Sequence, residues 1–180
     1  MPERLNLGCG TDVRQGWVNL DVADLPGVDV VHDLAELPLP FADERFSEVL
    51  ANDVLEHLDY IPVVRELHRV VASGGRLHVR SPHFTSAAVW VDPTHRTSFS
   101  IETFQFFARS GSLGGRSYYF DFSFERLECA RITFHRYRWQ PWNYLLEPLV
   151  NAHPRLQAFY EETGLSRLFP AANVEATLVK

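Results

Sequence analysis

The chain has 180 residues, of which 46% are hydrophobic and 22% are charged. This length and composition are typical of one soluble globular domain with a full core. The net charge of −6 argues against a nucleic acid partner, because proteins that bind polyanions are usually basic. The sequence has no apolar stretch as long as a membrane span and no signal-peptide pattern, so we expect a cytoplasmic protein. The aromatic C-terminal segment could contact a membrane surface, but its near lack of lysine argues against membrane contact.

The two cysteines, Cys9 and Cys129, do not form a Cys-x-x-Cys pair. A zinc site built on thiolates is therefore not expected. Cys9 lies inside a glycine turn, where a small side chain is needed, and we interpret it as a packing residue rather than a reactive thiol.

The first strand pattern, residues 4–8, runs directly into Gly8-Cys9-Gly10. A second strand pattern, residues 17–21, ends on Asp21. Glycines let the polar part of a ligand approach the backbone closely, and an acidic residue at the tip of the next strand can accept hydrogen bonds from a ribose diol. This pairing predicts a nucleotide-like ligand.

The interval between these two strands is too short for the helix of several turns found in dinucleotide-binding folds. Val13 stands where the third glycine of Gly-x-Gly-x-x-Gly would be. Because a pyrophosphate needs that helix N-terminus, a nicotinamide oxidoreductase is only a weak alternative.

Further strand patterns follow at residues 28–31, 46–51 and 77–81, with a helix after Asp59 that Gly74-Gly75 is expected to end. Strands joined by crossovers predict a parallel sheet covered on both faces.

After Pro82 the pattern changes, and residues 82–98 have no clear period. The remaining segments predict, in order, a capped helix at 100–107, a glycine-serine loop at 110–117, a long strand at 122–138, two short helices at 141–169 separated by Pro148 and Pro154, and a final strand at 174–179.

Residues 4–82 resemble the class I S-adenosylmethionine-dependent methyltransferases. The resemblance rests on an ordered set of motifs: Leu5-Asn6-Leu7-Gly8-Cys9-Gly10, Asp21, His32-Asp33-Leu34, Asn52-Asp53-Val54-Leu55-Glu56-His57, and Arg65-Glu66-Leu67-His68-Arg69-Val70 before Gly74-Gly75. The most similar group is small bacterial enzymes with a Gly-Trp-Val-Asn-Leu-Asp stretch and a downstream Asp92-Pro93-Thr94-His95-Arg96 loop.

The resemblance implies an α/β, Rossmann-like class I methyltransferase fold. Its sheet is mostly parallel and seven-stranded with an antiparallel last strand, and residues 122–136 and 173–180 would supply the final hairpin. The chain departs from the family in its shortened first crossover and in having no N-terminal helix, which leaves open what closes the methionine side. We expect one domain over residues 1–180: a cofactor-binding half, 1–82, and an acceptor-side half, 83–180, with a helical insertion at about 141–169.

The resemblance also implies S-adenosyl-L-methionine as the cofactor. Gly8 and Gly10 would lie under its methionine and ribose, Asp21 would bind the ribose hydroxyls, Asp33 the adenine amine, and Asn52 would face the methionine part. The full set of cofactor-binding residues expected by this match is Leu7, Gly8, Cys9, Gly10, Asp21, Val22, Asp33, Leu34, Asn52, Asp53 and His57.

Catalytic candidates follow the later strands. His83 is the first choice for a general base and His95 the second, and Arg96 could bind an anionic group on the acceptor. His57 has both a structural and a site interpretation. We predict no metal ligands, although His83, Asp92 and His95 have residue types that could form a metal site.

The resemblance implies a methyltransferase for a small or medium acceptor. The histidines after the later strands favour oxygen as the attacking atom, with a histidine as the base, and the resemblance to small bacterial methyltransferases implies a sugar or glycan-precursor hydroxyl as the acceptor. The alternative is a catalytically inactive S-adenosylmethionine-binding module that serves as a subunit or regulator. The aromatic side chains of the C-terminal helices suggest that the chain forms a homodimer.

Overall fold

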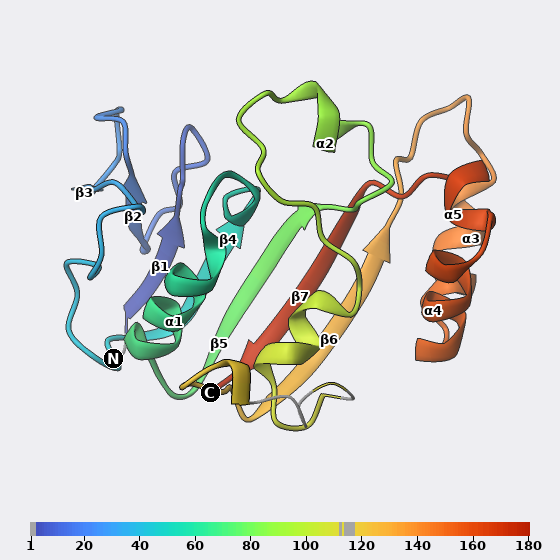
Figure 1. Cartoon of the computed structure of the whole chain (residues 1–180). Helices are drawn as coiled ribbons and strands as arrows, with labels where there is room; N and C mark the ends of the chain where they lie inside the picture. Colours follow the sequence, from blue (N-terminus) through green and yellow to red (C-terminus); the bar gives the residue numbers. More distant parts are fainter. Residues whose placement is uncertain (1–2, 112, 114–117) are drawn as a thin grey trace.

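The computed structural model describes residues 3–111, 113 and 118–180. Its centre is a seven-stranded sheet of order β3-β2-β1-β4-β5-β7-β6 (Figure 1). Strand β7 is antiparallel to both of its neighbours, whereas the other pairs are parallel, which confirms the expected fold class. The strands are β1 (Glu3–Leu7), β2 (Val18–Asp21), β3 (Val30–Val31), β4 (Phe46–Asn52), β5 (Val71–Pro82), β6 (Arg126–Thr133) and β7 (Asn173–Val179).

Helices cover one face of this sheet and one of its edges (Figure 1). Helix α1 buries Val63, Val64, Leu67 and Val70 against the core. The helical segments are η1 (Leu55–His57), α1 (Tyr60–Val70), α2 (Ala88–Val91), η2 (Thr103–Phe107), α3 (Asn143–Val150), α4 (Pro154–Glu162) and α5 (Leu165–Leu168). Among the described residues, no helix has the length and hydrophobicity needed to cross a membrane.

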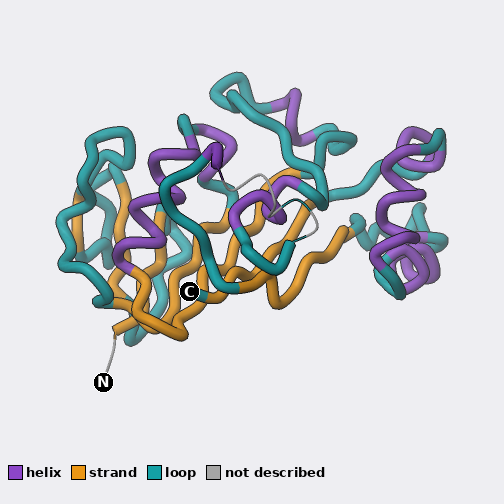
Figure 2. Tube along the Cα trace, turned by 60° about the horizontal axis from the view of Figure 1, so that its bottom comes forward, coloured by secondary structure: helices purple, strands orange, loops and turns teal. Residues whose placement is uncertain are grey.

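The opposite face of strands β4–β7 is polar, and Figure 2 shows the strands lying along one side of the molecule. His78 of β5 contacts Glu48 at 3.2 Å and the Thr177 hydroxyl at 3.0 Å, and Arg76 binds Glu128 at 2.8 Å. These side chains come from neighbouring strands and are partly exposed. The expectation of a sheet covered on both faces is therefore wrong for these strands, because their outer face is satisfied by cross-strand polar pairs.

The crossover from β1 to β2 is a loop organised by the amide of Asn19. Its Oδ1 accepts from Asn6 Nδ2 at 3.1 Å and from the Arg14 backbone N–H at 2.8 Å, while its Nδ2 donates to Asp29 Oδ2 at 3.0 Å. Asn6 and Asn19 are each only 3% exposed. These bonds satisfy the buried polar groups of the crossover without a helix, so the shortened crossover is an ordered loop with its own hydrogen-bond network.

The expected end of the first helix at Gly74-Gly75 is wrong, because α1 ends at Val70 and β5 begins at Val71. The two glycines instead form an irregular start to β5. Gly74 has φ +77°, its N–H donates to the Lys180 carbonyl at 2.7 Å, and a Cβ on Gly75 would lie 2.8 Å from the Ala72 carbonyl oxygen.

Several other boundaries differ from the predicted ones. The long strand is confined to β6, the third strand to two residues, and the helix expected at 100–107 is the shorter η2. Pro148 does not separate two helices, since α3 continues through it; its exposed position lets water reach the carbonyl that loses its partner. Of the loop expected at 110–117, residues 112 and 114–117 lie outside the described residues.

Candidate functional site

A cavity of about 240 Å³ lies at the carboxyl ends of β1, β2 and β4. Ligands of open α/β sheets bind at this edge of the sheet. The cavity is lined by Gly8, Asp21, Val22, Asp33, Leu34, Asp53, Val54, His57 and Leu58.

The turn after β1 requires glycine for a steric reason. Gly8 has φ +59°, and a Cβ built on it would lie 2.5 Å from Val54 Cγ2. Any side chain at this position would force Val54 to shift and would strain the backbone, so the glycine backbone itself forms this wall of the cavity.

Asp21 is held in place by the loops on either side of it. Its Oδ2 accepts from the Gly10 N–H at 2.7 Å, and its Oδ1 accepts from the Ala23 N–H at 3.0 Å. The carboxylate therefore has a fixed position at the tip of β2, with oxygen lone pairs remaining for a ligand.

Asp33 and Asp53 are also fixed by local bonds. Asp33 Oδ1 accepts from the Ala35 N–H at 2.8 Å in a turn after β3. Asp53 has φ +55°, and its carboxylate forms an ion pair with Arg80 of β5. Because the Arg80 guanidinium already neutralises Asp53, the carboxylate has a structural partner at the cavity edge.

The sequence prediction and the cavity agree at most positions. Leu7, Cys9, Gly10 and Asn52 were expected at the site but do not line the cavity, while Val54 and Leu58 line it and were not expected. Cys9 is buried and burial raises the pKa of its thiol, as a packing residue requires. The missed residues are the apolar members of the motif that follows β4.

The loop of residues 92–97 docks on η1 and brings His95 against His57, which lines the cavity. The N–H groups of Arg96 and Thr97 donate to the Glu56 carbonyl at 2.7 and 3.2 Å. The rings of His57 and His95 then meet edge to face, with centroids 4.6 Å apart.

A second cavity, of about 310 Å³, begins on the other side of His95. Its walls come from α2 and the loop after it, and they include Trp90, Asp92, His95 and Arg96. Since His57 lines the first cavity and His95 lines the second, the pair of rings lies where the two cavities approach each other.

A chain of hydrogen bonds fixes the tautomer of His57. The Thr94 hydroxyl donates to Asp92 Oδ1 at 2.6 Å, so it can only accept from His57 Nδ1, which lies 2.8 Å away. Nδ1 therefore carries the proton, and Nε2 keeps its lone pair. Burial, and then the neighbouring His95, lower the pKa of His57 and favour this neutral form.

His83 does not lie in a catalytic position. It is fully buried, its Nδ1 contacts the Thr85 hydroxyl at 2.7 Å, and its Nε2 contacts Glu161 at 2.9 Å. A general base must reach the acceptor, and a ring with both nitrogens occupied and no exposed surface cannot. We therefore correct the first choice of base, and assign His83 to the packing between β5 and α4.

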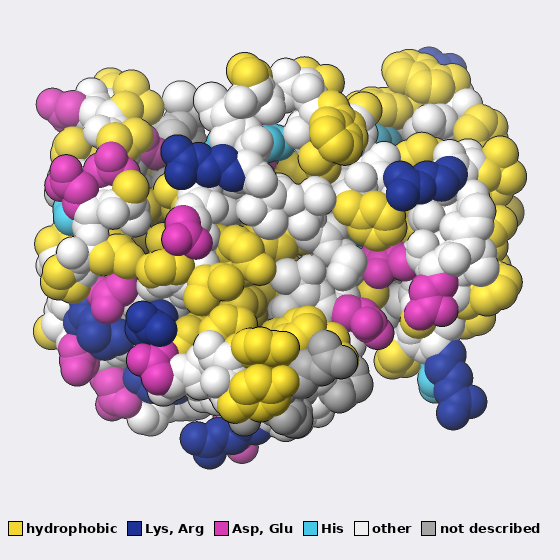
Figure 3. Space-filling view, in the orientation of Figure 1, with side chains coloured by type: hydrophobic (Ala, Val, Ile, Leu, Met, Phe, Trp, Pro, Cys, Tyr) yellow, Lys and Arg dark blue, Asp and Glu magenta, His cyan; other side chains and the backbone are white. Residues whose placement is uncertain are grey.

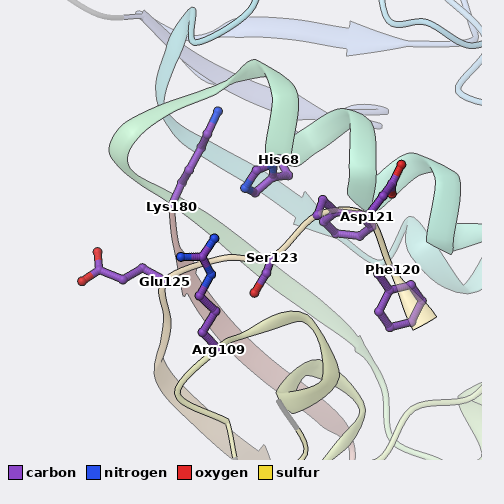
Figure 4. Close-up of a pocket in the computed structure, with 8 residues that line it drawn as sticks. His68, Arg109, Phe120, Asp121, Ser123, Glu125 and Lys180 are labelled. Carbon is purple, nitrogen blue, oxygen red and sulfur yellow. The ribbon is translucent and has the colours of Figure 1, made fainter. Parts of the chain in front are cut away.

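Another cavity, of about 770 Å³, lies at the other end of the sheet, near the amino end of β5. It lies between α1 and the segment before β6, and Figure 4 shows His68 and Arg109 on its opposite sides. Lys180 also borders it, and its Nζ donates to the Val71 carbonyl at 2.9 Å, at the amino end of β5. This position is opposite to the edge where such sheets bind ligands.

Comparisons with known proteins show similarity to methyltransferases. A family model described as a methyltransferase domain matches residues 7–79, the segment that supplies the whole first cavity. No curated protein sequence matches the chain.

Solved structures with the same fold include S-adenosylmethionine-dependent methyltransferases from three organisms. The enzyme from Archaeoglobus fulgidus is 16% identical with a TM-score of 0.61 and covers 99% of this chain and 86% of its own. The protein from Thermotoga maritima is 18% identical with a TM-score of 0.60, and the match covers 99% of this chain and 82% of that one. The protein from Mesorhizobium loti is 14% identical with a TM-score of 0.54, and the match covers 99% of this chain and 90% of that one. At these identities the likeness shows the fold alone, and the family model matches less than half of the chain. The chain is therefore similar to S-adenosylmethionine-dependent methyltransferases in its fold and, over residues 7–79, to a methyltransferase domain in its sequence.

Proposed function

We propose that this protein methylates a hydroxyl group of a small or medium acceptor, such as a sugar or a glycan precursor. The observation that carries the proposal is the contact between His57 and His95, each of which lines one of two neighbouring cavities. A methyl donor in one cavity and an acceptor in the other would meet beside an imidazole that can accept a proton.

The first cavity has the residue types that an adenosyl ligand requires. Asp21 would accept hydrogen bonds from the ribose hydroxyls, and Asp33 would accept from the adenine amine beside the apolar Leu34. Gly8 would let the methionine part lie against the backbone. When bound, S-adenosylmethionine supplies an electrophilic methyl group on a positively charged sulfur.

On the acceptor side, we assign His95 and Arg96 to catalysis. His57 is a third candidate. Alignment of an acceptor for in-line attack contributes up to about 7–11 kcal/mol, and a positioned base about 10²- to 10⁴-fold in rate. His57 Nε2 or His95 would take the hydroxyl proton. The Arg96 guanidinium suits a phosphate or carboxylate on the acceptor, and the Trp90 ring, 80% exposed, offers a flat apolar surface.

A transfer assay with a methyl-labelled donor and a panel of nucleotide sugars tests this proposal. We expect label in at least one acceptor, and a loss of about 10²-fold or more when His95 is replaced by Ala. Methyl transfer by the His95→Ala variant at the rate of the unmodified protein would show that His95 is not the base.

The second candidate function is a module that binds S-adenosylmethionine without turnover and acts as a subunit or regulator. The observation that favours it is the first crossover, in which a loop held by Asn19 stands where a helix normally walls the methionine side. It predicts cofactor binding with no transfer to any acceptor, and unchanged partner binding in the His95→Ala variant.

A homodimer stays part of the proposal. Apolar side chains lie on the surface over α3–α5 (Figure 3). The exposed members of this surface are Trp142, Tyr144, Leu145, Leu149, Phe159 and Leu168.

A further inference from the structure

Three side chains beside the cofactor cavity have the types and the spacing of metal ligands. Glu56, His57 and His95 each offer one ligand atom, and these atoms lie within 4.8 Å of one another. Glu56 and His57 belong to η1, and His95 comes from the loop docked on it.

Two atoms of this group are buried and have no hydrogen-bond partner among the described residues. They are Glu56 Oε1 and His95 Nδ1. Glu56 is only 1% exposed, and its other carboxylate oxygen accepts from the Ser81 hydroxyl at 3.0 Å. An unpaired carboxylate oxygen at such depth is costly, and a cation between Glu56 and His95 would satisfy both atoms at once.

His57 is oriented as a metal ligand usually is. Its Nδ1 donates to Thr94, which in turn donates to Asp92, and this arrangement leaves the Nε2 lone pair available. In metal sites the second ring nitrogen of a ligating histidine almost always donates to a carboxylate, a carbonyl or water, which fixes the ring and raises its basicity. Here the carboxylate acts through one threonine hydroxyl.

We propose that Glu56, His57 and His95 bind a divalent transition metal ion. Two imidazoles and one carboxylate suit Zn²⁺, Fe²⁺, Co²⁺ or Mn²⁺ and leave coordination positions open. Asp53 is not part of the set, because Arg80 already pairs with it.

The position of the ion deepens the proposed function, on which this second step rests. His95 borders the second cavity, so an open coordination position would face an acceptor there. A hydroxyl bound to the ion would ionise more easily, as metal-bound water does. In this form of the proposed function the ion takes the place of the histidine base, because the lone pairs of His57 and His95 are bound to it. The acceptor O–H bond breaks and its proton leaves to solvent. The oxygen electron pair forms the bond to the methyl carbon, and the electrons of the broken carbon–sulfur bond stay on sulfur.

This step predicts a class of acceptor. A hydroxyl with a second oxygen donor on the neighbouring carbon would occupy two open positions and bind best, as vicinal diols and α-hydroxy acids can. Simple alcohols would be poorer acceptors.

The test uses the full chain after removal of metal by a chelator. Co²⁺ is added while the visible absorption of its d–d bands is followed, and Zn²⁺ binding is measured by calorimetry. We expect one ion per chain, about 10- to 100-fold weaker binding for Thr94→Val, which removes the hydroxyl that links His57 to Asp92, and at least that loss for His95→Ala and Glu56→Gln. The matched control is His78→Ala, which removes a histidine from the polar sheet face.

Glu56→Gln keeps the size of the side chain and an oxygen that can accept from Ser81, so it is the variant least able to perturb the fold. Thermal unfolding of each metal-free variant shows whether it is folded. Absence of Co²⁺ binding in the folded protein, or binding that His95→Ala and Glu56→Gln leave unchanged, would overturn the metal site. A parallel titration with S-adenosylhomocysteine separates the two proposals: if the ion binds and this ligand does not, the metal site stands and the proposed function fails.

Discussion

The imidazole rings of His57 and His95 contact each other edge to face, although they come from two separate motifs of the sequence. The contact exists because backbone N–H groups of the second motif donate to the Glu56 carbonyl within the first. One motif lines the first cavity and the other lines the second. The relation between the two cavities thus depends on main-chain hydrogen bonds, which hold the two imidazoles in contact.

Replacement of Asp21 by Ala tests the ribose contact. We expect affinity for S-adenosylhomocysteine to fall by about 1–3 kcal/mol, because a charge-assisted hydrogen bond is lost. The control is Asp24→Ala, which removes an exposed carboxylate from the same loop. Equal dissociation constants for the Asp21 variant and the unmodified protein, measured by calorimetry, would exclude Asp21 from the site.

Two glycine variants separate the steric and backbone effects in the first turn. Gly8 and Gly10 both have positive φ, but a Cβ on Gly8 would collide with Val54, whereas a Cβ on Gly10 meets no atom within 4 Å. We expect both Gly→Ala variants to lose about 1 kcal/mol from strain, and Gly8→Ala to lose a further 1–3 kcal/mol. Urea unfolding measures the difference, and equal losses would show that Val54 does not confine Gly8.

The amide of Asn19 holds the first crossover in place, so its replacement should destabilise the fold near the first cavity. We expect Asn19→Ala to lower the free energy of unfolding by about 2 kcal/mol or more, because buried partners such as Asn6 and Arg14 N–H are left unsatisfied. Gln15→Ala, on the exposed part of the same loop, is the control. An unfolding free energy like that of the control would mean that water replaces the amide without cost.

The two histidines first considered as bases should behave differently. His83→Ala should lower stability by about 1–3 kcal/mol, since Glu161 and Thr85 lose a buried partner. His95→Ala should instead lower the turnover number and leave cofactor affinity nearly unchanged. Unfolding curves and single-turnover rates measured side by side distinguish these outcomes, and a stable but inactive His83→Ala variant would contradict the assignment made here.

The ionisation of Glu66 makes the free energy of unfolding depend on pH. Hydrogen bonds from Arg69, the shortest 2.7 Å, lower the pKa of Glu66 in the folded protein. A carboxylate with a lowered folded pKa stabilises the protein above its unfolded pKa, about 4.3, and this contribution is lost as the pH falls through the folded value. The stability gap between the unmodified protein and Glu66→Gln should therefore be present at neutral pH and close in acid. A constant gap would assign the effect to packing.

Local signals explain most of what the sequence predicted. Gly8, Asp21 and Asp33 follow strands directly, and the geometry of a turn depends on the residues within it, so these positions could be found without a structure. The polar sheet face also had a signal: Arg76-Leu77-His78-Val79-Arg80 alternates strictly, as a strand with one wet face does. This alternation indicates one solvent-exposed face, which the prediction of a sheet covered on both faces did not take into account.

The remaining features depend on contacts between distant segments. The residues next to His83 in the sequence do not indicate that Glu161 will contact its Nε2. In the same way, the residues next to Glu56 do not indicate that the N–H groups of residues 96 and 97 will donate to its carbonyl. The Asp92–Thr94–His57 chain forms only once that loop has docked. A role for the buried Glu56 could not be predicted, because burial of its carboxylate is a property of the whole core.

Calorimetric titration of the purified protein with S-adenosylhomocysteine, with NAD as the control ligand, tests the central claim most directly. We expect one binding site per chain for S-adenosylhomocysteine, weakened by Asp21→Ala, and no heat of binding with NAD. Binding of NAD in preference to S-adenosylhomocysteine, or no binding of S-adenosylhomocysteine with and without added metal ion, would contradict it.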